Sequence, residues 1–270
     1  MLKYPEPLIV LLNKPKGISS FQCCEKVRKI LGYKKAGHSG ILDFNVTGLL
    51  LTALGEATKL MPLFQHLDKA YKGVMHLHKD VSLDEIKENA KKFVGVIKQK
   101  PPKRSRVKRR IERERKIYKF EILGKKGKDV EFYVECEAGT YIRKLCHDFG
   151  LALGVNAHMA ELCRVAINSF KLNEAATFED LELGKKKGVL SIEKAAKRLK
   201  VRVLEVNDTG FERAKNGAKI FEEHLKHKIK IKETKGRYIC LSYKGKIFCL
   251  GILKEDAGKI YIKPERVLNV

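Results

Sequence analysis

The chain has 270 residues, 44% of them hydrophobic, and its 57 Lys and Arg against 32 Asp and Glu give a formal net charge of +25. This apolar content excludes global disorder, and no apolar run approaches the roughly 20 residues that a membrane-spanning helix needs. The charge favours a polyanionic partner, although a lysine-rich proteome or a ribosomal-type protein would produce the same balance.

The first predicted elements lead to one acidic residue. Ser19 and Gln22 have the spacing of a capping box, ahead of a helix that ends near Gly32. The following run, residues 37–48, places Asp43 in a loop punctuated by three glycines, and an apolar strand is expected over residues 49–54. An Asp in such a turn is most often an Asx-turn or a helix cap, so the loop alone is weak evidence for catalysis.

Strands and helices alternate irregularly through the middle of the chain. We expect a strand over residues 70–77, a helix from Ser82 to Gly95 with a second capping box, and a basic loop over residues 98–116, which contain eleven Lys or Arg and two acids. A predicted hairpin, residues 118–136, precedes a helix with one apolar face. Elements in this order favour the α+β class.

The composition shifts near residue 185, and short strands follow between residues 201 and 262 with one helix around residues 210–216. We therefore expect two domains, residues 1–198 and a small β-rich domain over residues 199–270. A small barrel of this kind could also bind an oligosaccharide or a peptide. Seven cysteines without a C-x-x-C pair indicate no zinc ribbon or disulfide framework, and without a signal peptide a cytoplasmic protein is expected.

Three motifs resemble those of the TruB and dyskerin class of pseudouridine synthases, and they occur in the family's order. They are residues 12–20, the Gly-His-x-Gly-x-Leu-Asp-x-x-x-Thr-Gly pattern of residues 37–48, and Gly-Thr-Tyr-Ile-Arg within residues 138–143. The resemblance covers nearly the whole chain and is strongest over residues 10–165. It implies a catalytic domain with a mixed, mainly antiparallel sheet, a C-terminal PUA-like β-barrel that binds RNA, and isomerisation of uridine to pseudouridine without a cofactor or metal.

The resemblance also implies which residues form the site. Asp43 would be the catalytic acid, acting on the sugar or base covalently or by removing the C2′ proton. A lone acid in a dry pocket needs a fixed cation to stay ionised, and Arg143 would be that cation. The residues that would bind the extruded nucleotide are His38, Tyr71, Tyr141 and Leu162. Without the resemblance, each of these residues reads more readily as core, surface or local turn structure.

Residues 75–81 and 101–109 look like the archaeal and eukaryotic dyskerin-type branch. That branch implies an H/ACA-type guide RNA held by the PUA-like domain, a ribosomal RNA or tRNA substrate, small accessory proteins, and a basic loop that closes over the substrate. The alternatives are a stand-alone tRNA pseudouridine synthase and a catalytically silent RNA-binding scaffold. A scaffold would need none of Asp43, Tyr71 and Arg143.

The chain departs from the family pattern in two places. Phe44 follows the acid where proline is usual, which removes a restraint on φ and leaves the rigidity of the loop open. The stretch before the first motif is also short, which leaves the docking of the tail open. Lys14, Pro15 and Gly17 are expected to support the loop rather than take part in chemistry.

Overall fold

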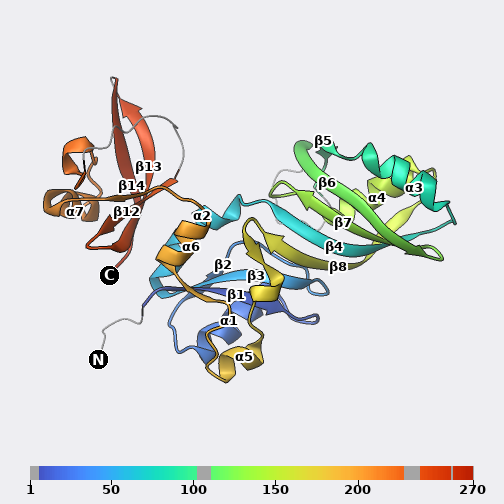
Figure 1. Cartoon of the computed structure of the whole chain (residues 1–270), viewed down its shortest axis with the longest axis horizontal. Coiled ribbons are helices and arrows are strands. Elements are labelled where there is room, and N and C mark those ends of the chain that lie inside the picture. Colours follow the sequence, from blue (N-terminus) through green and yellow to red (C-terminus); the bar gives the residue numbers. More distant parts are fainter. Residues whose placement is uncertain (1–5, 102–110, 228–237, 257, 270) are drawn as a thin grey trace.

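The computed structural model describes residues 6–101, 111–227, 238–256 and 258–269. Most of this chain is built around one large sheet, which runs from the centre of Figure 1 to its right-hand end. In the described residues the sheet has ten strands: β1 (Leu8–Lys14), β2 (Ala36–His38), β3 (Thr47–Leu54), β4 (Lys69–Leu77), β5 (Gly95–Gln99), β6 (Arg113–Lys126), β7 (Asp129–Cys136), β8 (Ala157–Ile167), β9 (Phe170–Lys171) and β10 (Val189–Ser191).

The strand order along the main path is β10-β1-β3-β8-β4-β7-β6-β5, while β2 pairs with β3 and β9 with β8. The β3–β8 pair is parallel, and the other strand pairs recorded for this sheet are antiparallel. The predicted α+β class with a mixed, mainly antiparallel sheet is therefore confirmed.

Helices occur between the strands of the large sheet and also in the C-terminal part of the chain. The α-helices in the described residues are α1 (Ser20–Ile30), α2 (Pro62–Gln65), α3 (Leu83–Lys91), α4 (Ile142–Ala152), α5 (Phe178–Glu182), α6 (Ile192–Arg198) and α7 (Asp208–Lys215). The 3-10 helices there are η1 (Gly55–Leu60), η2 (Leu172–Glu174) and η3 (Glu222–His224). The helical segment that follows β3 begins as the 3-10 helix η1 and continues as α2.

Both predicted helix starts are confirmed; the complete capping box forms at α1, whereas at α3 only the Ser82 cap is formed. The Gln22 N–H donates to Ser19 Oγ at 3.2 Å, and the Ser19 N–H donates to Gln22 Oε1 at 3.0 Å, so two otherwise unpaired donors of α1 are satisfied. At α3 the Glu85 N–H donates to Ser82 Oγ at 3.3 Å. These short-range bonds fix the direction in which α1 enters the loop that carries Asp43.

Strand β1 is apolar along most of its length because both of its faces are covered. Ile9 and Leu11 pack into one core with residues of η1, α2 and α6. Val10 and Leu12 pack into another core with residues of α1 and α5. A third core joins α3 and α4 to β4, β6 and β7 and includes Phe149 of α4. This third core holds the start of α4, where Tyr141 and Arg143 lie.

The predicted basic loop over residues 98–116 is shorter than expected. Its two ends belong to strands, because β5 and β6 pair in antiparallel register from Gly95 opposite Ile117 to Gln99 opposite Arg113. The centre of the predicted loop, residues 102–110, lies outside the described residues.

The C-terminal part forms a second sheet, drawn in orange and red at the left of Figure 1. Its strands are β11 (Val203–Glu205), β12 (Tyr238–Tyr243), β13 (Lys246–Asp256) and β14 (Lys259–Val267), in the order β11-β12-β13-β14. In the described residues this sheet is open, so the expected closed barrel is not found there. The physical reason is that β11 is only three residues long and leads directly into α7, whose Ala214 covers the apolar face of the sheet instead. The strand expected over residues 229–231 lies outside the described residues.

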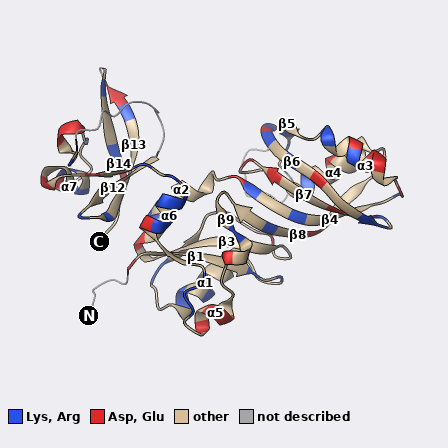
Figure 2. Cartoon of the chain, in the orientation of Figure 1, with Lys and Arg blue, Asp and Glu red and all other residues tan. Residues whose placement is uncertain are grey.

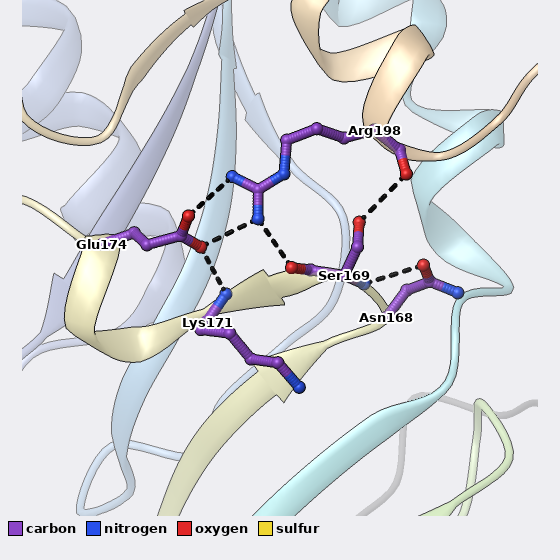
Figure 3. Close-up of polar contacts among 5 residues, drawn as sticks. All are labelled: Asn168, Ser169, Lys171, Glu174 and Arg198. Atoms are coloured by element: carbon purple, nitrogen blue, oxygen red, sulfur yellow. Dashed lines mark hydrogen bonds and ion pairs between the residues drawn. The ribbon is translucent and has the colours of Figure 1, made fainter.

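Helix α6 connects the two sheets, and Figure 3 shows how its end is anchored. The Arg198 guanidinium donates to both carboxylate oxygens of Glu174, at 3.0 and 2.8 Å, and to the Ser169 carbonyl at 2.6 Å. It also lies 4.6 Å from the ring centroid of Phe170. Side chains of the C-terminal sheet, among them Leu250, share a core with Ile9 of β1. The two parts of the chain are therefore packed together.

No described helix is long and apolar enough to cross a membrane.

Candidate active site

The loop that carries Asp43 is held by a buried lysine. Lys14 at the end of β1 is fully buried, and its Nζ donates to the carbonyls of Pro15 at 3.0 Å, Phe44 at 3.3 Å and Val46 at 2.7 Å. Burial lowers the pKa of Lys14. The Phe44 carbonyl also accepts the Gly17 N–H at 3.0 Å. Lys14 and Gly17 thus contact the loop as expected. Their hydrogen bonds restrain Phe44, the residue that stands where the family usually has proline.

Asp43 and Arg143 form an ion pair. Arg143 Nε lies 3.0 Å from Asp43 Oδ2, and the two residues are 100 positions apart in the sequence. Arg143 is the second residue of α4, and Tyr141 is the N-cap residue of the same helix. The side chains of Asp43 and Arg143 are 50% and 43% exposed, so the expectation of a dry pocket is wrong for the chain on its own. The pair lies at the surface because the loop and the start of α4 meet at the edge of a cavity.

The cavity beside the ion pair has a volume of about 620 Å³. It lies where the Asp43 loop, β4, β8 and the start of α4 meet. The six residues that the sequence predicted for the site all line it: His38, Asp43, Tyr71, Tyr141, Arg143 and Leu162. Residues from four separate parts of the chain are therefore brought together around one space large enough for a nucleotide.

Tyr71 forms the buried side of this cavity. It lies on β4 opposite Val134 of β7 and Arg164 of β8. Arg164 lines the same cavity, and burial raises the pKa of the Tyr71 hydroxyl. Tyr71 is therefore a neutral phenol at neutral pH. Met159 and Leu162 of β8 also line the cavity and supply apolar surface.

Two further cations, Arg164 and Lys69, line the cavity and were not among the predicted site residues. Arg164 is 1% exposed, and its Nε donates to the Leu49 carbonyl at 2.7 Å while its Nη2 lies 3.4 Å from the Gly40 carbonyl. Burial lowers the pKa of Arg164. The available signal was a single Arg within the otherwise apolar run of residues 162–167, because an arginine is rarely buried unless its donors are paired.

Lys69 is the first residue of β4 and is also buried. Its Nζ donates to the carbonyls of Leu67 and Gln65. Burial, assisted by the nearby charge of Arg164, lowers the pKa of Lys69 to about 8. The cavity thus has cations both at its mouth and in its wall, an arrangement suited to a polyanionic ligand such as RNA.

A close approach of two strands sets the position of Arg164. Gly48 on β3 has φ +105° and pairs with Arg164 on β8. A Cβ atom at Gly48 would lie 2.4 Å from the Arg164 carbonyl oxygen, which is far inside van der Waals contact. The glycine that ends the Asp43 motif is therefore required for the contact between β3 and β8. Among the described residues, no group of three or more His, Cys, Asp or Glu side chains is arranged to hold a metal.

Two family models match adjoining parts of the chain, together residues 28–199. Residues 28–142 match the N-terminal domain of the TruB family of pseudouridylate synthases, and residues 143–199 match the C-terminal domain of tRNA pseudouridylate synthase B. The first match contains Asp43, Tyr71 and Tyr141, and the second begins at Arg143.

Curated relatives are similar over about two thirds of this chain. The probable tRNA pseudouridine synthase B of Methanocaldococcus jannaschii is 48% identical over 173 residues, which cover 64% of this chain and 51% of that protein. The protein of the same name from Pyrococcus abyssi is 48% identical over 174 residues, covering 64% of this chain and 52% of that protein. The match thus spans about half the length of these relatives.

Solved structures resemble the whole chain. The Cbf5 chain of a Cbf5-Nop10-Gar1 complex superposes with a TM-score of 0.83 at 33% identity, over 99% of this chain and 90% of that chain. A chain of an H/ACA RNP bound to a substrate RNA containing 2′-deoxyuridine superposes with a TM-score of 0.81 at 32% identity, over 97% and 85%. With the family motifs gathered around one cavity and similarity along the chain, this protein belongs to the TruB family of pseudouridylate synthases.

Proposed function

We propose that this chain is an RNA pseudouridine synthase that isomerises uridine to pseudouridine, with Asp43 as its catalytic acid. The observation that carries the proposal is the Asp43–Arg143 ion pair at the mouth of a cavity whose buried wall holds Tyr71. In this isomerisation the N1–C1′ bond breaks, a C5–C1′ bond forms, and the C5 proton is replaced by one at N1. The reaction is balanced without an oxidant, a reductant or a cofactor.

Each residue has a role that its position suits. Asp43 attacks the sugar or base, or removes the C2′ proton. The positive charge of Arg143 keeps the Asp43 carboxylate ionised and orients it. Tyr71 receives the face of the extruded base, and Tyr141 and Leu162 enclose it. His38 ends β2, directly before the Asp43 loop, and contacts the nucleotide. Because Asp43 and Arg143 are half exposed in the free chain, the bound nucleotide supplies the cover that excludes water from them.

We propose further that an H/ACA-type guide RNA selects the target, in ribosomal RNA and also in tRNA. The proposal is supported by the similarity to Cbf5 in complexes with Nop10 and Gar1, and to a chain of an H/ACA RNP with bound substrate RNA. Small accessory proteins of that kind would complete the particle. The second candidate is a stand-alone tRNA pseudouridine synthase, which the names of the curated relatives favour.

The remaining assignments concern the domains. We propose that residues 1–198 form the catalytic domain and that residues 199–270 form a PUA-like unit that binds the guide RNA. Support comes from the separate four-stranded sheet of the C-terminal part, which has a core of its own around Leu241 and Phe248. The basic segment over residues 98–116 is proposed to contact substrate phosphates through its lysines and arginines.

The test is tritium release from RNA labelled at C5 of uridine, because that proton leaves during the isomerisation. We expect the purified chain to release tritium from RNA that carries a guide-paired target, and Asp43→Asn to release none. Release from tRNA without any guide would favour the stand-alone enzyme. An absence of release from guided RNA and from tRNA alike, with RNA binding intact, would contradict the proposed activity and favour the scaffold.

A further inference from the structure

The side-chain amide of Gln99 clamps the backbone of Tyr141. Gln99 is the last residue of β5, is 2% exposed, and lies 42 positions before Tyr141 in the sequence. The Tyr141 N–H donates to Gln99 Oε1 at 3.0 Å, and Gln99 Nε2 donates to the Tyr141 carbonyl at 3.3 Å. One planar amide therefore satisfies both backbone groups of a single residue.

The clamped residue is the one from which α4 begins. Tyr141 is the N-cap of α4, with φ −95° and ψ 103°, and its own side chain makes no capping hydrogen bond. Its carbonyl also accepts the Leu145 N–H at 2.9 Å, which is the first hydrogen bond of the helix. Gln99 thus sets the place where the chain turns from extended to helical, and it does so from a strand that has one neighbour in the described sheet.

The consequences reach the catalytic pair because Arg143 is two residues beyond the clamp. Its Nε lies 3.0 Å from Asp43 Oδ2, and the Tyr141 side chain lines the same cavity. A shift of the helix start would move the Tyr141 ring and the Arg143 guanidinium together. Displacements of about 1 Å at reacting groups can cost on the order of 100-fold in rate.

We propose that Gln99 is a positioning residue of the reaction, which holds Tyr141 and Arg143 in register with Asp43 without touching the substrate. This inference rests on the proposed function. It makes a specific chemical demand, because only a side chain with a donor and an acceptor on one edge can satisfy both groups of Tyr141. An ionised carboxylate at this position accepts from the N–H but cannot donate to the carbonyl, whereas a protonated carboxyl does both.

The experiment compares Gln99→Met, Gln99→Glu and Ile97→Ala in the full-length chain. Ile97 lies on the same strand and packs against the same core, so its substitution loosens β5 without touching the clamp. For Gln99→Met we expect kcat to fall by about 10- to 100-fold, with little change in KM for RNA and faster hydrogen exchange at the Tyr141 amide. Ile97→Ala is expected to lower the melting temperature while keeping most of kcat.

The Gln99→Glu variant adds a pH profile that a merely structural role would not produce. Because burial raises the pKa of a carboxyl group, the introduced acid gains its proton as the pH falls. The kcat of Gln99→Glu relative to wild type should therefore rise toward acidic pH, whereas the relative kcat of Gln99→Met stays constant.

Three outcomes would overturn the inference. One is a Gln99→Met enzyme that keeps kcat within about twofold of wild type. Another is an equal loss of kcat in Gln99→Met and Ile97→Ala at matched loss of stability. The third is unchanged exchange protection of the Tyr141 amide in Gln99→Met, which would refute the clamp. This measurement also works if the wild-type chain has no activity and the proposed function fails. In that case, lost protection of the Tyr141 amide in Gln99→Met would still support the clamp.

Discussion

Asp43 carries the proposed chemistry from a position that is half exposed, so its environment differs between the free chain and a complex with RNA. Its loop is nevertheless held by hydrogen bonds, since the buried Lys14 side chain and the Gly17 N–H both donate to the carbonyl of Phe44. Because the loop is restrained, the Asp43 carboxylate keeps its orientation when RNA binds. The same arrangement separates catalysis from affinity, because the phosphates of RNA would meet other residues.

Asp43→Asn should therefore abolish isomerisation while leaving RNA binding almost unchanged. The amide cannot act as nucleophile or base, so we expect turnover to fall by on the order of 10⁴-fold or more, and the dissociation constant for RNA to change by no more than about twofold. Tritium release and filter binding measure the two quantities. Asn45→Ala, in the same loop but outside the cavity lining, is the control and should keep activity. Appreciable turnover by Asp43→Asn would remove Asp43 from the mechanism.

Lys69 makes the stability of the protein depend on pH in a defined window. Its pKa in the folded chain is lowered to about 8 from 10.5, so between these values the folded chain has lost a proton that the unfolded chain retains. Stability then rises with pH across this window. Lys69→Met should lose this rise, which we expect to be on the order of 3 kcal/mol.

The measurement is the free energy of unfolding in urea between pH 7 and pH 10.5. The difference between wild type and Lys69→Met isolates Lys69, because cysteines and tyrosines that titrate in the same range are common to both. Lys72→Met on the exposed side of the same strand is the control and should show no such difference. An unfolding free energy difference that stays constant with pH would contradict the burial of a lysine with a lowered pKa.

At the level of elements, α6 decides how the C-terminal sheet is attached. Arg198 at its end contacts Glu174 and Ser169 (Figure 3), and its guanidinium also lies over the ring of Phe170; all three residues belong to the segment that follows β8. Glu193 at its start accepts the Ile247 N–H of β13 at 3.2 Å. This short helix therefore contacts the large sheet's side of the junction through its last residue and the C-terminal sheet through a residue of its first turn.

Arg198→Ala should weaken this junction. The variant loses a two-point ion pair and a cation–π contact, but both charged side chains are partly exposed, so the expected cost is about 1 kcal/mol in unfolding free energy. Hydrogen exchange in α6 should increase before any increase in α3. Lys197→Ala, one residue earlier and exposed, provides the comparison. Equal exchange of α6 in the two variants would show that the Arg198 network does not anchor the helix.

At the scale of the whole molecule, positive charge is distributed over both sheets and the helix between them. Figure 2 shows Lys and Arg on β4, β8 and α6. On the C-terminal unit the rings of Phe211 and Tyr243 stack at 4.2 Å, with Lys215 and Lys244 each 5.0 Å from a ring centroid. Phe211 and Tyr243 are partly buried against the core of this unit, and accessible aromatic rings with adjacent lysines are typical of surfaces that contact single-stranded RNA.

Reversing the charge of the lysines beside Phe211 and Tyr243 should weaken RNA binding, because contacts with RNA phosphates would be lost. The double variant Lys215→Glu, Lys244→Glu is expected to lower affinity for guide RNA and to flatten the slope of log affinity against log salt by roughly one unit per lost contact. Reversing Lys87 and Lys91 on α3 makes the same change in net charge elsewhere. If both double variants show the same salt slope, the C-terminal unit makes no preferred contact with RNA. Deleting the unit is a poorer test, because Leu250 shares a core with the large sheet.

The sequence by itself determined the features that depend on neighbours along the chain. The helix starts at Ser19 and Ser82, the apolar strand at residues 49–54 and the glycine-punctuated Asp43 loop all appear where they were expected. Helix caps, strand periodicity and turn residues act within a few positions of one another, so the pattern of residues is enough to predict them. The family motifs likewise named six residues that line one cavity.

Only the tertiary structure decided which distant groups meet. The burial of Lys69, the partners of Arg164, the clamp of Gln99 on Tyr141 and the exposure of the Asp43–Arg143 pair have no local signal, and neither does the open form of the C-terminal sheet in the described residues. These contacts depend on strand register, and β4 pairs with β8 through two register shifts that move every following side chain relative to its partner. A period of two residues specifies the face on which a side chain lies but not the residue opposite it, and that opposite residue is what closes the site.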